Sequence, residues 1–138
     1  MKAVFADTAY WVAIFRPGDP WRFYAIQARE TIRSARLVTT DEVLIEFLAA
    51  LSAAGTQMRL EAAGFVRDLL SHPDIHVFPQ SRETFLAGLA LYEARPDKNY
   101  SLTDCISMNV MRSESITAAL TSDRHFVQEG FSILMQKQ

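Results

Sequence analysis

The 138-residue chain contains one cysteine, five glycines and five prolines, and it has no long uninterrupted apolar run. The single Cys105 cannot form an internal disulfide, so we interpret it as a small buried side chain in a protein from a reducing compartment. The longest apolar stretch, Val43 to Leu51, is broken by Glu46 and is too short to span a bilayer. No signal-peptide pattern opens the chain, and we therefore expect a cytoplasmic protein without membrane contact.

A strong net charge is also missing. Fourteen lysines and arginines against sixteen aspartates and glutamates give a formal net charge of −2. A non-catalytic DNA- or RNA-binding module would usually carry a basic stripe, so the composition argues against that class. An enzyme whose own acidic cluster must bind metal before a phosphate can approach remains compatible with this charge.

Apolar runs alternate with helical patterns along the whole chain, and no linker divides it. We expect residues 1–138 to form one domain, with strands at 4–6, 37–40, 75–78, 116–121 and 131–134. Helices are predicted at 21–35, 41–54, 57–70, 81–94, 101–112 and 124–128, with Gly55 as the C-terminal cap of the second of these. This alternation predicts a three-layer α/β/α fold with a central parallel sheet and helices on both faces.

Four acidic residues stand at ends of predicted strands or in helices with little other charge: Asp7, Glu46, Asp104 and Asp123. Carboxylates are costly to bury unless a positive charge compensates them. In open parallel sheets, sites form beyond the carboxyl ends of the strands, where Asp7 and Asp123 fall. Mg²⁺ and Mn²⁺ prefer oxygen ligands and can promote cleavage of a phosphodiester. The four acids therefore predict a divalent-metal site in an enzyme that acts on phosphates.

Each acid also has an alternative, purely structural interpretation. Asp7 and Asp123 are placed to cap the short helix that follows each of them, and the segment from Ser101 to Asp104 fits a capping box. Glu46 could lie on a solvated helix face, although most residues three and four positions away are apolar. These roles do not explain why the acids gather at one predicted edge of the sheet.

Four segments follow one another with a recognisable order and spacing. Asp7-Thr8 follows the first predicted strand, and residues 39–46 cover the second strand and the start of its helix. Residues 100–107 contain the sequence S-L-T-D, and residues 121–126 read T-S-D-R-H-F, with their aspartates 19 positions apart. Over the full length of the chain, this arrangement resembles the PIN-domain ribonucleases. It is most similar to the VapC-type toxins of type II toxin–antitoxin pairs.

The resemblance implies an endoribonuclease that hydrolyses RNA with Mg²⁺ or Mn²⁺. Asp7, Glu46, Asp104 and Asp123 would be its catalytic and metal-binding acids, with Asp7 and Asp104 as the direct ligands. The resemblance also implies a homodimer and a small antitoxin protein as partner. Thr8 matches a hydroxyl often found beside the first aspartate, whereas Ala9 departs from relatives that have a second small polar residue there.

Several neighbouring side chains are candidates for supporting roles. Thr103 and Ser122 are expected to orient nearby backbone or carboxylates, since neither has a base partner that would make it a nucleophile. Arg124 is a candidate for contact with a substrate phosphate, and a surface role is equally compatible with its position. His125 is interpreted as a surface residue rather than as a phosphate contact. The aromatic residues near the start of the chain are expected in the core or on a dimer face: Trp11, Phe15, Trp21 and Phe23.

Other functions are open from the sequence. The same acids would serve a nuclease that cuts DNA or matures a structured RNA. A non-catalytic module with this fold would have little reason to keep four costly acids. A phospho-receiver domain normally has paired acids early in the chain and a lysine near its last strand, whereas here Asp7 stands alone and Lys137 is next to the end.

Overall fold

A five-stranded parallel sheet forms the centre of the computed structural model, which describes residues 2–137. The strands are β1 (Ala3–Ala6), β2 (Arg36–Thr40), β3 (Ile75–Phe78), β4 (Ala118–Leu120) and β5 (Ser132–Ile133). Their order across the sheet is β3-β2-β1-β4-β5, and every pairing is parallel. The predicted parallel sheet is confirmed.

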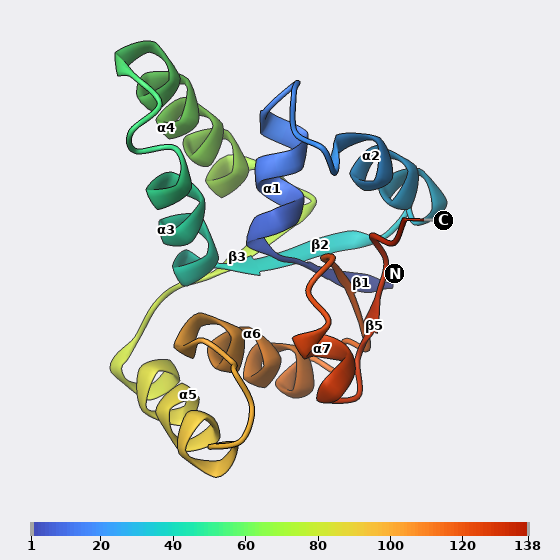
Figure 1. Ribbon diagram of the computed structural model, residues 1–138, viewed down its shortest axis with the longest axis vertical. Helices are drawn as coiled ribbons and strands as arrows, with labels where there is room; N and C mark the ends of the chain where they lie inside the picture. Colours follow the sequence, from blue (N-terminus) through green and yellow to red (C-terminus); the bar gives the residue numbers. More distant parts are fainter. Residues whose placement is uncertain (1, 138) are drawn as a thin grey trace.

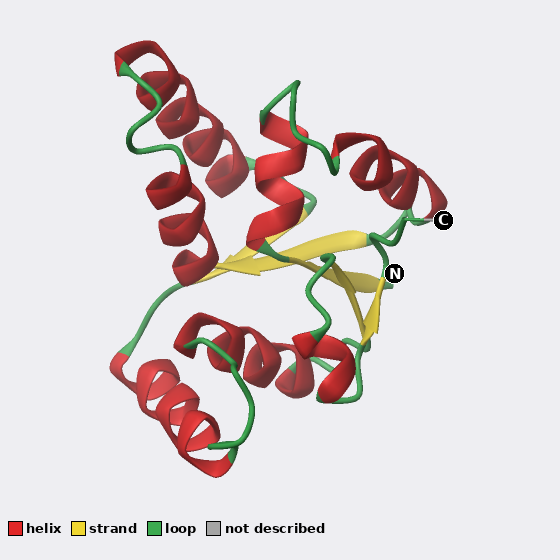
Figure 2. Ribbon diagram, in the orientation of Figure 1, coloured by secondary structure: helices red, strands yellow, loops and turns green. Residues whose placement is uncertain are grey.

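Helices cover both faces of this sheet (Figures 1 and 2). On one face lie α1 (Thr8–Phe15), α2 (Arg22–Thr31), α3 (Asp41–Ala50) and α4 (Thr56–Ser71). On the other lie α5 (Arg82–Ala94), α6 (Leu102–Ser113) and α7 (His125–Gln128). The chain runs from β1 outward to β3 and then returns to β4 on the other side of β1. Because crossovers keep one hand, this reversal sends the later helices to the opposite face.

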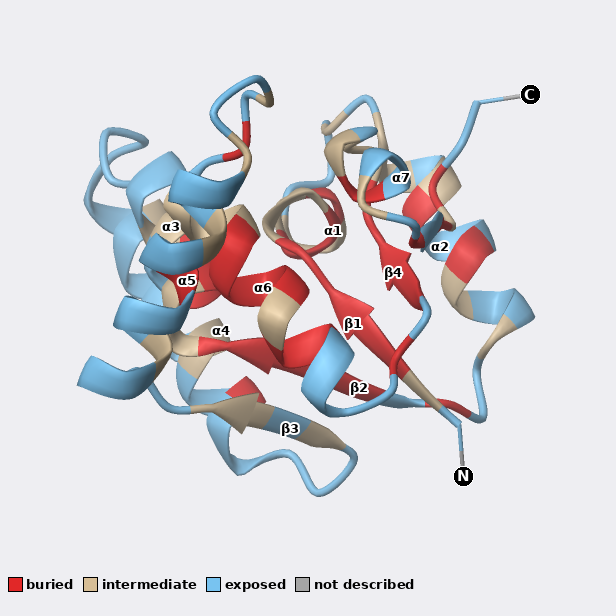
Figure 3. Cartoon of the chain, turned by 90° about the horizontal axis from the view of Figure 1, so that it is seen from below, coloured by how far each residue is buried: buried red, intermediate tan, exposed pale blue. Residues whose placement is uncertain are grey.

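The reversal makes β1 and β4 neighbours at the centre of the sheet. Phe5 and Ala6 of β1 pair with Ala119 and Leu120 of β4, and all four are inaccessible to solvent. Figure 3 shows β4 and all of β1 except its beginning as buried. In open α/β sheets, the point where strand order reverses is where sites form, beyond the carboxyl ends of the two strands. The strand order therefore predicts a functional site among the residues that follow β1 and β4.

Aromatic side chains fix the helices on the first face. Phe65 of α4 contacts Trp11 and Phe15 of α1 and Phe47 of α3, with ring centroids 5.3–6.1 Å apart. Trp11 is 3% exposed, as expected for a core residue. Phe23 differs, because 66% of its surface is exposed. None of the helices in the described part of the chain has the length and apolar character that crossing a membrane requires.

Several element boundaries differ from the sequence predictions. The helix expected over 41–54 ends at Ala50, and residues 51–54 form turns. The prediction that Gly55 caps the end of this helix was wrong: it is the N-cap of α4, with a φ of 101° that favours glycine. The helix expected over 21–35 ends at Thr31, and the strand expected over 116–121 pairs only over Ala118–Leu120.

Candidate metal centre

Asp7 directly follows β1, where its backbone N–H continues the pairing with β4 by donating to the carbonyl of Leu120, 3.2 Å away. The residue is 6% exposed, and its Oδ2 accepts a hydrogen bond of 2.9 Å from the Thr121 hydroxyl. Asp7 occupies the N-cap position of α1, but its side chain makes no capping hydrogen bond. The capping interpretation of Asp7 therefore does not describe its side chain.

Burial raises the pKa of Asp7 to about 7. Hydrogen bonds from the Thr8 backbone and the Thr121 side chain act against this rise, while the charges of Asp104 and Glu46 add to it. A carboxyl group with a pKa near neutrality is typical of a functional site, because structural carboxylates usually have compensating partners. Asp7 thus lies in a buried and negatively charged environment.

Glu46 reaches the same edge of the sheet from α3. This helix begins directly after β2, where the Thr40 hydroxyl caps it by accepting from the backbone N–H of Val43 at 3.1 Å. One turn further, Glu46 is half-buried, and its Oε1 accepts a hydrogen bond of 2.6 Å from the Thr8 hydroxyl. The carboxylate of Glu46 is therefore directed towards α1, and the solvated-face interpretation does not hold.

Asp104 comes from the opposite face of the sheet, at the start of α6. The predicted capping box is present: the Ser101 hydroxyl accepts from the Asp104 N–H, and Asp104 Oδ2 accepts from the Ser101 N–H, each at 3.0 Å. Capping does not exclude a second role, since the same carboxylate faces Asp123 and His125. Burial raises the pKa of Asp104, and the charges of Asp123 and Glu46 contribute to the rise.

Asp123 follows β4 and orders the entry into α7, because its Oδ1 accepts from the backbone N–H of His125 at 2.9 Å. The imidazole of His125 turns back towards the acids. Its Nδ1 lies 3.2 Å from Asp123 Oδ1 and 3.5 Å from Asp104 Oδ2. One ligand atom each from Asp104, Asp123 and His125 all lie within 4.8 Å of one another. These three residues form the tightest group of potential metal ligands.

The donor set fits a divalent cation. Among residues 2–137, none of the four acids forms an ion pair with a lysine or arginine, and the charges of neighbouring acids help to raise the pKa of Asp7 and of Asp104. The Nδ1 atom of His125 is buried and has no hydrogen-bond partner in the described part of the chain. Repelling carboxylates beside an unpaired imidazole nitrogen are the groups that a bound cation would stabilise.

Comparisons with known proteins show the family and the fold of this chain. The family model described as PIN domain matches residues 4–131. The chain belongs to the PIN domain family. The crystal structure of VapC20 from Mycobacterium tuberculosis, a toxin that cleaves the sarcin–ricin loop, is similar in fold. Its TM-score is 0.81 at 23% sequence identity, over 93% of this chain and 95% of that one. No curated protein matches the chain.

The PIN-domain prediction is thus confirmed, and two of the four predicted acids lie together in one group of potential metal ligands. Asp104 and Asp123 are adjacent, while Asp7 and Glu46 are close enough for their charges to act on the same site. Thr8 has a definite contact, the hydrogen bond to Glu46. The remaining candidates lie nearby, Thr103 and Ser122 half-buried and Arg124 exposed, and their supporting roles stay predictions.

Sequence reasoning missed Thr121 in this PIN domain and set His125 aside. Thr121 is fully buried; it donates to Asp7 and accepts from the backbone N–H of Asp123 at 3.1 Å. It connects two of the acids because the residues that follow β1 and β4 are neighbours. The available signal was a hydroxyl residue between a buried strand and an aspartate, but its meaning depends on the strand order.

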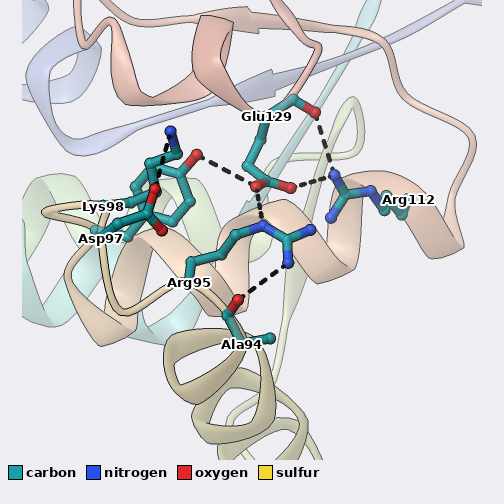
Figure 4. A network of polar contacts seen from close by, with 7 residues as sticks. Ala94, Arg95, Asp97, Lys98, Arg112 and Glu129 are labelled. Carbon is teal, nitrogen blue, oxygen red and sulfur yellow. Dashed lines mark hydrogen bonds and ion pairs between the residues drawn. The ribbon is translucent and has the colours of Figure 1, made fainter.

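A separate ionic network surrounds Glu129 (Figure 4), and Tyr100 connects this network to the imidazole of His125. The ring of Tyr100 packs edge-on against His125, with centroids 5.5 Å apart, and its hydroxyl donates to Glu129 at 3.2 Å. The two oxygens of Glu129 also accept from Arg95 at 2.6 Å and from Arg112 at 2.5 Å. The network joins the 95–100 loop, α6 and the end of α7 beside the acids.

Proposed function

We propose that the protein is a divalent-metal-dependent endoribonuclease that acts as the toxin of a toxin–antitoxin pair. One observation carries the proposal: acids from β1, α3, α6 and the segment after β4 converge without a lysine or arginine partner among the described residues. Membership of the PIN domain family supports a nuclease. The similarity in fold to a toxin that cleaves RNA supports the more specific assignment.

In this proposal, Asp7, Glu46, Asp104 and Asp123 hold Mg²⁺ or Mn²⁺. When bound, the ion supplies a water of lowered pKa and charge stabilisation for the leaving oxygen of the phosphodiester. The chain holds the acids in place: Thr121 orients Asp7, Thr8 orients Glu46, and the backbone of Ser101 orients Asp104. Arg124, exposed at the start of α7, is positioned to contact the phosphate backbone of the substrate.

The same assignment implies a substrate, a protein partner, an oligomeric state and a cellular location. RNA is the substrate, a small antitoxin protein is the partner, and the toxin works as a homodimer in the cytoplasm. Residues 1–138 act as a single nuclease domain. A size-exclusion run with light scattering, with and without the product of the adjacent gene, measures both associations.

A cleavage assay on labelled RNA tests the central claim. We expect cleavage with Mg²⁺ or Mn²⁺, none with EDTA, and a loss of about 100-fold or more in rate for Asp104→Asn. Asp68→Asn, at an exposed acid on α4, is the matched control and should cut like the parent. If Asp104→Asn keeps the parent rate while circular dichroism shows an intact fold, the assignment is wrong. The same assay on labelled single-stranded DNA distinguishes a ribonuclease from a nuclease that cuts DNA.

A further inference from the structure

The imidazole of His125 is the least explained group beside the acids. Its Nδ1 is buried, faces one oxygen of Asp123 at 3.2 Å and one of Asp104 at 3.5 Å, and lacks a hydrogen-bond partner among residues 2–137. A buried polar atom without a hydrogen-bond partner destabilises the folded protein, because its interactions with water are lost and not replaced. A group with this cost at a metal centre requires a functional explanation.

The spacing of the three atoms suggests what satisfies the nitrogen. Neighbouring ligands on one octahedral ion, each about 2.1 Å from it, lie about 3 Å apart. The separations of Nδ1 from the two carboxylate oxygens are close to this value, and all three atoms fall within 4.8 Å of one another. A cation between them would satisfy both carboxylates and the nitrogen together.

The ring of His125 is held in this orientation from two sides. Its backbone N–H donates to Asp123 Oδ1, which fixes the start of α7 relative to that acid. Tyr100 packs edge-on against the imidazole, and the hydroxyl of Tyr100 donates to Glu129, which Arg95 and Arg112 hold in place. Metal-binding histidines need such support, because a ligand must be oriented before the ion arrives.

We propose that His125 is a direct nitrogen ligand of the metal and that it makes this centre select Mn²⁺ over Mg²⁺. The inference rests on the metal site of the proposed function and adds a fifth protein ligand to the four acids. Mg²⁺ prefers oxygen ligands and gives up its waters reluctantly. First-row transition ions accept imidazole nitrogen, so a mixed site of carboxylates and one imidazole favours them.

Pulsed electron paramagnetic resonance on the Mn²⁺-loaded protein tests the ligand directly. We expect nitrogen modulation from a coordinated imidazole, and a change in that modulation when the histidines carry ¹⁵N. The signal should disappear in His125→Ala and persist in His76→Ala, a control at an exposed histidine on β3. Absence of nitrogen modulation from the wild-type protein with Mn²⁺ bound would overturn the inference. That result would leave the nuclease proposal standing, whereas absence of any Mn²⁺ or Mg²⁺ binding would sink both.

Affinity measurements test the selectivity. Mn²⁺ is titrated into the protein, and Mg²⁺ is then used to displace it. We expect His125→Ala to weaken Mn²⁺ binding by about 10-fold or more and Mg²⁺ binding by less than about threefold. His125→Gln, which keeps a polar side chain, should show the same difference. Equal losses for both ions in both variants would contradict the proposal, because they would indicate that His125 only orders the site.

Discussion

The carboxylates of Glu129 and Asp7 are both nearly inaccessible to solvent, yet their pKa values move in opposite directions. The Glu129 side chain is 5% exposed and Asp7 is 6% exposed. Burial alone would raise the pKa of Glu129, but the hydrogen bonds and charges of Arg95 and Arg112 outweigh it and lower that pKa. For Asp7, only hydrogen bonds from the Thr8 backbone and the Thr121 side chain oppose the effect of burial, and its pKa rises to about 7.

The difference distinguishes a structural ionic network around Glu129 from the acids of the candidate metal centre. Glu129 has its compensating cations within the chain, so its charge stabilises the contact between α6, α7 and the 95–100 loop. Among residues 2–137, Asp7 and its neighbouring acids have only each other, His125 and hydroxyl or backbone donors. A buried acid that lacks an internal cation makes folding costly, and a cation from solution would remove that cost.

Among the variants that test this contrast, Asp7→Asn should change the free energy of unfolding the most. A pKa raised from 3.8 to about 7 means that the folded state binds the proton more tightly than the unfolded state. The contribution of Asp7 to stability is therefore full below about pH 4 and is lost as the pH rises towards 7. At about 1.4 kcal/mol per pH unit, Asp7→Asn should stabilise the metal-free protein at pH 8 by up to about 4 kcal/mol.

Urea unfolding in EDTA between pH 4.5 and 8 measures this effect. The wild-type free energy of unfolding should fall with rising pH more steeply than that of Asp7→Asn. Addition of Mn²⁺ should restore the stability lost at high pH in the wild type only. Asp68→Asn serves as the control. Parallel pH profiles for the wild type and Asp7→Asn would remove the basis of the comparison with Glu129.

Glu129→Gln should have an effect of opposite sign. Its amide cannot form ion pairs with Arg95 and Arg112, so we expect the free energy of unfolding at pH 7 to fall by about 1–3 kcal/mol. Because the pKa of Glu129 is lowered in the folded protein, its stabilising contribution is present above the ordinary value of 4.5 and is lost at more acid pH. The gap between variant and wild type, measured by urea unfolding, should therefore narrow below pH 4. A constant gap would indicate packing rather than charge.

The smallest effect is expected for an ion pair in solvent. Glu30 lies on α2 and Arg33 in the turn that follows it, and their charged atoms are 2.8 Å apart. The side chain of Arg33 is 78% exposed and that of Glu30 is 68% exposed. Glu30→Gln should change stability by less than about 0.5 kcal/mol in the same assay. A larger loss would show that proximity alone, rather than burial, gives the Glu129 network its strength.

The sequence predicted the parallel sheet and most of its helices, and it drew attention to the four acids, because both inferences depend on local pattern. Alternating strands and helices imply a parallel sheet, and acids after apolar runs imply a site at its edge. The contacts of Thr121 could not be predicted in this way, since they require β1 and β4 to be adjacent. His125 and Glu129 read locally as surface residues around a short helix. Their partners come from segments 17 to 34 residues earlier: Asp104, Tyr100, Arg95 and Arg112.

Asp104 caps the start of α6 and also belongs to the group of potential metal ligands. Its Oδ2 accepts the backbone N–H of Ser101, so removing the carboxylate also weakens the start of α6. Asp7 caps nothing with its side chain, and losing its charge relieves the fold. For the proposed nuclease, an inactive variant intended to trap uncut RNA for crystallisation is therefore better made at Asp7, directly after β1, than at Asp104 in the first turn of α6.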